Sequence, residues 1–330
     1  MPTITPNTAA EPTSETTLIT GAAGFAGRHL LAHLQADAAA GPLLAWSRRP
    51  QPNEAGVAWR VVDVTDKEAV DRAIAEARPT RIAHLAGSPH VGQSWKNSMA
   101  PLRTNVMGTH HILEAVRQHC PSCRVLVVTS AMIYHASDTP LTEDAPLVPT
   151  NPYGLAKLAQ DQLALLAAET DHLDVVIARP FNHVGPGQDP SFALSSFARQ
   201  IARIEHGLTP AEVRVGNLDA ERDLTDVRDT VRAYAQLLDT GQSGRAYNIC
   251  TGLAVRIGDL LDQLIALARA PVTRAVDPAR LRPSDLPRLV GDASRLRAEV
   301  GWLPQRAIAD TLGDTLDWWR EEVAAGRDVR

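Results

Sequence analysis

Short apolar runs alternate along the first half of the chain with stretches that carry apolar residues at helical spacing. The apolar runs lie at 17–20, 43–46, 59–62, 81–85, 124–129 and 174–178. The stretches with helical spacing lie at 25–34, 67–77, 102–118 and 153–169. Runs of β-branched residues with few polar positions are typical of parallel strands that are covered on both faces. The pattern therefore predicts a doubly wound α/β fold, in which helices cover both faces of a parallel sheet.

The second half of the chain is less regular and richer in proline and glycine. Helical spacing returns there at 192–205, 227–238, 257–268 and 308–322. Residues 1–16 are rich in Thr, Pro and Ala and lack periodicity, so we expect a flexible tail. We expect residues 17–181, with 222–252 returning to them, to form a nucleotide-binding domain. Residues 182–221 and 253–330 would form a smaller C-terminal substrate-binding domain.

Composition narrows the functional class. Lys plus Arg number 33 and Asp plus Glu 38, so the net charge of −5 argues against nucleic acid as the main partner. No run of 18 apolar residues exists and the N-terminus lacks the features of a secretory signal, so we expect no membrane span. Three cysteines are too few for a disulfide scaffold, and we expect a reducing, cytoplasmic compartment. The Cys120–Cys123 pair lacks the further ligands of a zinc site, and no metal is expected.

A glycine-rich turn, TGAAGFAG at 20–27, follows the first apolar run and opens the first helical stretch. Glycines in this place allow a tight turn and a close approach of the backbone to a pyrophosphate, and the helix N-terminus attracts that anion. The sequence therefore predicts a Rossmann-type dinucleotide site. Its cofactor-binding residues would be Gly21, Ala23, Gly24, Phe25, Ala26 and Gly27.

The end of the second run indicates which dinucleotide binds. A carboxylate there would select the ribose hydroxyls of NAD, but the run ends in Ser47, Arg48 and Arg49. A hydroxyl and two guanidinium groups suit a 2′-phosphate, although the arginines could also belong to a solvated turn. We expect NADP(H) to be preferred and NAD(H) to be possible. Further cofactor contacts are expected from Asp63 and Val64 after the third run, and from Leu85, Ala86 and Gly87 after the fourth.

Candidate catalytic residues follow. Tyr153 and Lys157 are four residues apart on one helix, so their side chains share a face, and a nearby ammonium group would lower the pKa of the Tyr153 phenol. Ser130 ends the apolar run at 124–129, at the edge of the sheet where doubly wound folds bind ligands. The three side chains could together move a proton and stabilise a substrate oxygen.

The motifs TGAAGFAG, HLAG at 84–87, Ser130 and YGLAK at 153–157 resemble, in this order, the extended short-chain dehydrogenases/reductases that act on nucleotide sugars. The resemblance covers about residues 17 to 320. It implies a Rossmann-type domain with a smaller substrate domain and a Ser130–Tyr153–Lys157 catalytic triad. It also implies that Lys157 holds the nicotinamide ribose and that Pro180 contacts the cofactor.

One position distinguishes the reactions of the family. Its dehydratases carry Thr at the position of Ser130 and, two residues later, a Glu that removes water from the sugar. Here Met132 stands at that position and cannot abstract a proton. The resemblance therefore implies a keto-reductase or a 4-epimerase; a 4,6-dehydratase or a non-catalytic NADP-binding regulator is a weaker alternative.

Motifs in the second half resemble family members that use GDP-hexoses, in particular the reductases of GDP-4-dehydro-6-deoxy-D-mannose that form GDP-D-rhamnose. These motifs are RPFNH at 179–183, VGNLDAERD at 215–223, TDVRD at 225–229 and RPSD at 282–285. The resemblance implies that Asn182 and Arg222 bind the diphosphate and that Arg282 and Asp285 lie by the nucleotide. Ser88 and His90 could contact the sugar.

Subunit contacts are expected at two helices. Stretches 102–118 and 153–169 carry apolar residues on more than one face, which would leave an exposed apolar patch on a monomer. The family resemblance implies that they pair with their copies across a two-fold axis, so a homodimer is expected. His110 and His111 adjoin on the first of these helices and point to different faces, which suits surface or subunit contacts better than a shared metal.

Overall fold

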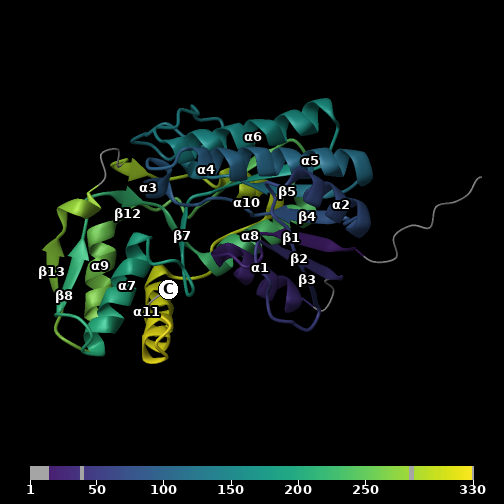
Figure 1. The fold of residues 1–330 in the computed structure, drawn as a ribbon. Helices are drawn as coiled ribbons and strands as arrows, with labels where there is room; N and C mark the ends of the chain where they lie inside the picture. Colours follow the sequence, from purple (N-terminus) through teal and green to yellow (C-terminus); the bar gives the residue numbers. More distant parts are fainter. Residues whose placement is uncertain (1–14, 38–40, 282–285, 329–330) are drawn as a thin grey trace, which may run out of the picture.

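A seven-stranded parallel sheet organises the first part of the molecule (Figure 1). The computed structural model describes residues 15–37, 41–281 and 286–328. The strands, in their order across the sheet, are β11 (Ala246–Ile249), β6 (Val175–Pro180), β5 (Arg124–Val128), β4 (Arg81–His84), β1 (Thr17–Thr20), β2 (Leu43–Ser47) and β3 (Val57–Val61). Every neighbouring pair is parallel, which confirms the doubly wound α/β fold.

Helices cover both faces of this sheet because apolar residues face both ways along its inner strands. On β1, Leu18 packs into one core and its neighbour Ile19 packs into the core on the opposite face. The first core includes residues of α2 (Lys67–Ala77), α5 (Gly108–His119) and α6 (Pro152–Thr170). The second includes residues of α1 (Phe25–Gln35), α8 (Val227–Thr240) and α10 (Ser294–Val300).

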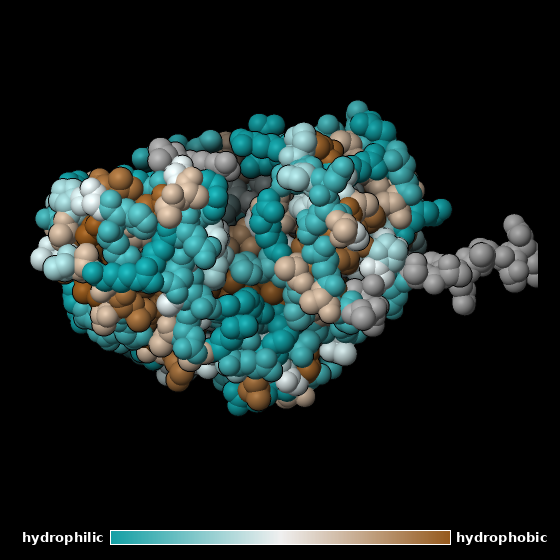
Figure 2. Space-filling model, turned by 90° about the horizontal axis from the view of Figure 1, so that it is seen from below, coloured by the Kyte–Doolittle hydropathy of each residue, from teal (hydrophilic) through white to brown (hydrophobic). Residues whose placement is uncertain are grey.

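A second lobe lies beside the carboxyl end of the sheet (Figure 1). Its helices are α7 (Ala193–Glu205), α9 (Ile257–Ala266) and α11 (Ile308–Ala324). They pack around a core that includes Phe197, Leu261 and Leu316, against the parallel pair β8 (Glu212–Val215) and β13 (Thr273–Val276). Seen from below, the surface is hollowed between this lobe and the part of the molecule built on the large sheet (Figure 2).

Two small sheets connect the sheet domain with the lobe. Strand β7 (Asn182–Val184) pairs in parallel with β10 (Leu224–Asp226). Strand β9 (Glu221–Arg222) lies between β12 (Val255–Arg256) and β14 (Arg288–Leu289). These pairings bring the motifs at 179–183, 215–223 and 225–229 together near the hollow between the two parts.

The helix expected at 102–118 is more complex in the structure. It begins as α4 (Met99–Pro101), continues through the π-helical turn η1 (Leu102–Met107) and becomes α-helical only in α5. Gly108 lies at that change, where a Cβ atom would lie 2.8 Å from a methyl group of Val64. The wider turn buries Asn105 completely beneath the loop that follows β4.

The structure differs in two places from the expected division into tail, nucleotide-binding domain and substrate domain. Thr16, expected in the flexible tail, donates its backbone N–H to the Thr80 hydroxyl at 2.9 Å; residues 1–14 lie outside the described residues. Leu296 and Trp302, expected in the substrate domain, instead pack in the core of the large sheet. The second core therefore combines residues from the first strands with residues near position 300. No helix among the described residues has the length and apolar character to cross a membrane.

Candidate active site

The three predicted catalytic residues come together at the carboxyl edge of the sheet. Ser130 follows β5, and its hydroxyl lies close enough to the Tyr153 phenol to act on the pKa of that group. Tyr153 lies in the first turn of α6, which Asn151 caps by accepting the backbone N–H of Gly154 at 2.8 Å. The cap fixes where the helix begins and so fixes the phenol relative to the end of β5.

Close packing at Gly154 brings the serine and tyrosine segments together. A Cβ atom on Gly154 would overlap the backbone oxygen of Met132, in the short turn η2 (Ala131–Ile133) after Ser130. Only a residue without a side chain allows this approach. Met132 itself donates its backbone N–H to the Ser130 hydroxyl at 3.2 Å, which orients that group.

The Tyr153 phenol remains protonated at neutral pH. Burial raises its pKa to about 12, and the hydrogen bond with Ser130 only partly opposes this effect. We expected Lys157 to lower the pKa of this phenol, and that expectation is wrong for the protein alone, because burial raises the pKa and the group that opposes this effect is Ser130, not Lys157. A neutral phenol is the form of tyrosine that can donate a proton.

Lys157 is buried beside the loop that follows β4. Its ammonium donates to the backbone oxygen of Val128 at 2.9 Å and to Oε1 of Gln160 at 2.8 Å. Burial lowers the Lys157 pKa to about 7, an effect that the nearby Asp161 carboxylate partly opposes. A Cβ atom on Gly87 would lie 3.6 Å from Nζ, so the loop backbone passes close to the ammonium.

The glycine-rich turn has the features of an anion site. Gly21 adopts a positive φ of 69°, and its close contact with the Ala86 backbone leaves no room for a Cβ atom. Helix α1 begins at Phe25 without a side-chain cap and without an acidic residue in its first turn. Its first N–H groups and the positive end of the helix are therefore available to a pyrophosphate, and this donor set fits a dinucleotide cofactor.

The end of β2 fits a 2′-phosphate. Arg48 and Arg49 are exposed, and neither guanidinium group has an ion-pair or hydrogen-bond partner among the described residues. The Ser47 hydroxyl donates to the backbone oxygen of Arg49, and the backbone N–H of Ala22 donates to the backbone oxygen of Trp46 at 3.1 Å. These contacts hold the arginine turn against the glycine-rich turn.

The other expected cofactor residues lie along the same edge. Asp63 is exposed and accepts both the backbone N–H and the hydroxyl of Thr65, each at 2.9 Å. Leu85 and Ala86 are half-buried and Gly87 is exposed, as expected for a loop that can cover a ligand. Two expected contacts, Val64 and Pro180, are buried in the structure.

The residues expected to bind the substrate are less closely grouped than the three catalytic residues. Asn182 is exposed on β7, whereas Arg222 on β9 donates to the backbone oxygens of Glu221 and Leu286 at 2.9 and 2.7 Å. Ser88 donates its backbone N–H to Asn105, and the His90 ring lies 3.1 Å from the Ser191 hydroxyl. Arg282 and Asp285 lie outside the described residues.

An arginine-lined hollow of about 440 Å³ lies between α7 and β8. Its lining includes Arg199, Arg203, Arg214 and Arg280. Arg203 pairs with Asp328, and Arg280 donates to the Ser196 hydroxyl at 3.2 Å. In the sequence, Arg280 stands two residues before the predicted nucleotide-side motif at 282–285.

Comparison with known proteins places the chain in a family. Residues 18–315 match the family model described as GDP-mannose 4,6 dehydratase. The chain belongs to this family of extended short-chain dehydrogenases/reductases. GDP-6-deoxy-D-mannose reductase of Pseudomonas aeruginosa is 34% identical over 308 residues, which cover 92% of this chain and 97% of the relative. dTDP-glucose 4,6-dehydratase of Neisseria gonorrhoeae is 29% identical over 333 residues, covering 92% and 94% of the two chains.

Solved structures give the same family assignment. RMD from Pseudomonas aeruginosa complexed with NADPH superposes with a TM-score of 0.83 at 32% identity, covering 94% of this chain and 100% of that one. UDP-glucose 4-epimerase of Thermus thermophilus, complexed with NAD, gives a TM-score of 0.81 at 27% identity and covers 92% and 99%. The resemblance that the motifs indicated is confirmed.

Buried polar residues behind the triad were not found from the sequence. Asn105, Thr109 and Gln160 are completely buried near Lys157, and one side-chain nitrogen of Asn105 has no partner among the described residues. Each lies in a stretch whose sequence predicts a regular helix, where a single polar residue gives no signal. Arg179, the first residue of the motif at 179–183, also serves the interior, since it pairs with Asp161 at 2.7 Å.

The histidines have mainly structural contacts. His111 is buried and its Nδ1 lies 2.9 Å from the backbone oxygen of Val64, so it does not form the surface contact that we expected. His110 is exposed, as expected. The His183 ring stacks on Phe25 at 5.8 Å, next to the glycine-rich turn. The described residues contain no group of three His, Cys, Asp or Glu side chains arranged for a metal ion.

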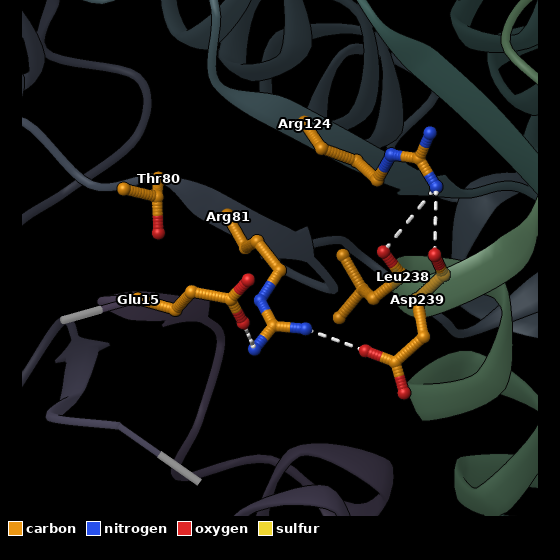
Figure 3. Close-up of a pocket in the computed structure, with 6 residues that line it drawn as sticks. All are labelled: Glu15, Thr80, Arg81, Arg124, Leu238 and Asp239. Carbon is orange, nitrogen blue, oxygen red and sulfur yellow. Dashed lines mark hydrogen bonds and ion pairs between the residues drawn. The ribbon is translucent and has the colours of Figure 1, made fainter.

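A second hollow, of about 390 Å³, lies at the opposite edge of the sheet and contains no triad residue (Figure 3). Arg81 at the start of β4 pairs there with Glu15 and with Asp239. Arg124 at the start of β5 donates to the backbone oxygens of Leu238 and Asp239 (Figure 3). The two arginines and the two carboxylates around this hollow neutralise one another. The hollow at the amino end of the sheet therefore offers no net charge to a ligand.

Proposed function

We propose that the chain is an NADPH-dependent reductase of the 4-keto group of a nucleotide sugar, with GDP-4-dehydro-6-deoxy-D-mannose as substrate and GDP-D-rhamnose as product. The observation that carries the proposal is the Ser130–Tyr153–Lys157 arrangement with Met132 at the position of the dehydratase glutamate. The Pseudomonas aeruginosa relative named GDP-6-deoxy-D-mannose reductase supports the substrate. The likeness to RMD complexed with NADPH supports the cofactor.

In this reaction the residues of the chain act on the carbonyl oxygen at C4 of the sugar. When bound, NADPH supplies the hydride for C4. Tyr153, held as a neutral phenol, donates its proton to the C4 oxygen, and Ser130 donates a hydrogen bond that stabilises negative charge developing there. The Lys157 ammonium stabilises the phenolate that Tyr153 becomes after proton transfer.

The cofactor would lie along the carboxyl edge of the sheet. The N–H groups at the start of α1 would hold the pyrophosphate, and Arg48 and Arg49 would bind the 2′-phosphate. Asp63 would meet the adenine, and the loop at 85–87 would cover the middle of the dinucleotide. Lys157, beside Gly87, would hold the nicotinamide ribose.

The substrate would lie in the hollow between the two lobes. Asn182 and Arg222 would bind the diphosphate, and Ser88 and His90 would contact the sugar. The arginines that line the hollow between α7 and β8 suit the negative charge of a nucleoside diphosphate. Arg282 and Asp285 would lie by the guanine.

We also propose that the enzyme is a homodimer through the helices at 102–118 and 153–169. Figure 1 shows α5 and α6 side by side on one outer face of the molecule. On α6, Leu155 and Leu166 are 55% and 52% exposed, although they are large apolar residues. They are eleven residues apart, which places them on the same face of the helix. An isologous contact across a two-fold axis would cover them.

The decisive assay supplies the purified chain with NADPH and GDP-4-dehydro-6-deoxy-D-mannose. We expect stoichiometric oxidation of NADPH, and NMR of the product to show the D-rhamnose configuration at C4. Release of the C4 epimer as the reduced product would correct the stereochemistry. Interconversion of nucleotide-sugar epimers without any net consumption of NADPH would replace the reductase proposal with a 4-epimerase.

A further inference from the structure

A continuous chain of buried hydrogen bonds leads from the first strand to the catalytic lysine. Nδ1 of His84 lies 2.8 Å from the Thr20 hydroxyl, and Nε2 lies 3.0 Å from the Thr109 hydroxyl. Nε2 of Gln160 donates to the same Thr109 oxygen at 2.8 Å, and Oε1 of Gln160 accepts from Lys157 at 2.8 Å. All of these side chains are buried.

The direction of each hydrogen bond in the chain follows from its donors. The Thr109 hydroxyl donates its one proton to the backbone oxygen of Asn105 at 2.7 Å, so it can only accept from Gln160 and from His84. The Gln160 amide must therefore direct its nitrogen at Thr109 and its oxygen at Lys157. The neutral His84 ring donates from Nε2, so its Nδ1 can only accept, and the Thr20 hydroxyl donates to it while accepting the backbone N–H of Ala86 at 3.2 Å.

We propose that Gln160 is a positioning residue for Lys157, because its oxygen holds the ammonium beside Gly87 while the chain behind it prevents the amide from flipping. The inference rests on the proposed function, in which Lys157 assists Tyr153. An amide in a fixed orientation offers the lysine an acceptor only, so the contact favours the protonated ammonium over the neutral amine. Gln160 thus keeps Lys157 charged as well as in place.

Few other charges act on Lys157. On its own helix it faces Tyr153 and Asp161, and the Asp161 carboxylate is bound by Arg179 of β6. From β4 it faces His84, whose pKa burial lowers to about 3, so this ring stays neutral over the working pH range. The Lys157 pKa of about 7 places its titration where activity is measured. A change in one of its hydrogen bonds should therefore shift the pH at which activity falls.

When kcat/KM is plotted against pH, its alkaline limb reports the loss of the Lys157 proton. Two substitutions should move this limb in opposite directions. Gln160→Leu removes the acceptor at similar volume, which destabilises the ammonium, and we expect the limb to fall by about one pH unit. Gln160→Glu places a negative charge beside the ammonium, and we expect the limb to rise by a similar amount. Gln263→Leu is the control, since Gln263 is exposed on α9, outside both the site and the proposed dimer face, and should leave the limb unchanged.

A second measurement does not depend on turnover. The affinity for NADPH is measured against pH from the quenching of protein fluorescence, and the pH at which binding weakens should shift with the same signs. A limb position is independent of the fraction of folded enzyme, so partial misfolding of Gln160→Leu does not obscure it. If that variant does not fold, the upward shift expected for Gln160→Glu still decides.

The outcomes separate this inference from the proposed function. Suppose that the pH at which NADPH binding weakens shifts as expected, but the chain does not reduce the GDP-keto sugar. This result would retain the role of Gln160 and reject the reaction. A parent chain that reduces the sugar, with both Gln160 variants following the parent profile, would reject the role of Gln160. A shift of both variants in the same direction would show a general packing effect and would also overturn it.

Discussion

At the residue scale, burial determines the charge states of the triad. Desolvation keeps Tyr153 as a phenol and lowers the pKa of Lys157 to about 7, so the two groups are tuned in opposite directions from their ordinary values. The spacing of Tyr153 and Lys157 predicted their shared helix face, but it could not predict burial. For that reason the sequence predicted a lowered phenol pKa, whereas the structure shows a raised one.

Removal of the Tyr153 hydroxyl tests the proton donor. Tyr153→Phe keeps the buried ring and removes the acid, so we expect kcat to fall by about 10²–10⁴, the usual contribution of a positioned acid. The NADPH dissociation constant should remain nearly unchanged. Steady-state kinetics and fluorescence titration measure the two quantities, and turnover at the parent rate would remove Tyr153 from the mechanism.

The two exposed arginines after β2 test cofactor selectivity. Replacing both Arg48 and Arg49 with Ala removes charges that have no protein partner among the described residues, so the fold should be unaffected. NADPH binding should weaken by roughly 10- to 100-fold, because only NADPH carries the 2′-phosphate. NADH binding should change little. Equal losses for both cofactors in parallel titrations would mean that the arginines do not read the phosphate.

At the element scale, the helices and strands of the large sheet were predictable because each buries a strongly periodic set of residues. The helix expected at 67–77 matches α2 residue for residue, and the strand expected at 43–46 is β2 without its last residue. Short pairs such as β7 with β10 and β9 with β12 were missed. Two or three residues carry no period, and their pairing depends on partners more than 30 residues away.

The contact between α6 and the turn after Ser130 gives an element-scale prediction. Gly154→Ala forces a Cβ atom against the backbone oxygen of Met132, so the two segments must separate, and we expect a loss of about 1–3 kcal/mol in unfolding free energy. Activity should fall further than stability, because the same shift moves Tyr153 away from Ser130. Denaturant unfolding and kcat measure the two effects.

A second helical glycine is the control for Gly154→Ala. Gly313 lies within α11, and a Cβ atom there would meet no other atom within 4 Å. Gly313→Ala should therefore stabilise the chain by about 0.5–1 kcal/mol through helix propensity alone, with unchanged kcat. Equal stability changes at both glycines would contradict the close approach at Gly154.

At the scale of the whole molecule, the sequence predicted one large parallel sheet and a smaller lobe, but not how the chain passes between them. Leu296 and Trp302 return to the sheet after the chain has built most of the lobe. Nothing in the local pattern of residues 293–302 indicates which core they join, since both cores bury similar apolar side chains. The motif residues were found because their chemistry is local, whereas the network behind Lys157 depends on contacts between distant segments.

Dimer formation is the prediction that belongs to the whole molecule. Of the apolar residues that suggested the interface, Ile112, Leu113 and Val116 are buried in the core of the chain itself and cannot contribute. Leu155 and Leu166 remain exposed on α6, with Met107 46% exposed on the neighbouring segment. Light scattering at micromolar concentration should therefore give twice the 35.6 kDa mass of one chain.

Leu155→Glu should convert the dimer to the monomer mass, because an isologous contact would place the two new carboxylates in the same buried interface. Leu253→Glu is the control: Leu253 is 66% exposed outside these helices, and the same substitution there should leave the dimer intact. A parent mass of one chain would reject the dimer. A parent dimer that survives Leu155→Glu but dissociates on Leu253→Glu would move the interface from α6 to the loop between β11 and β12.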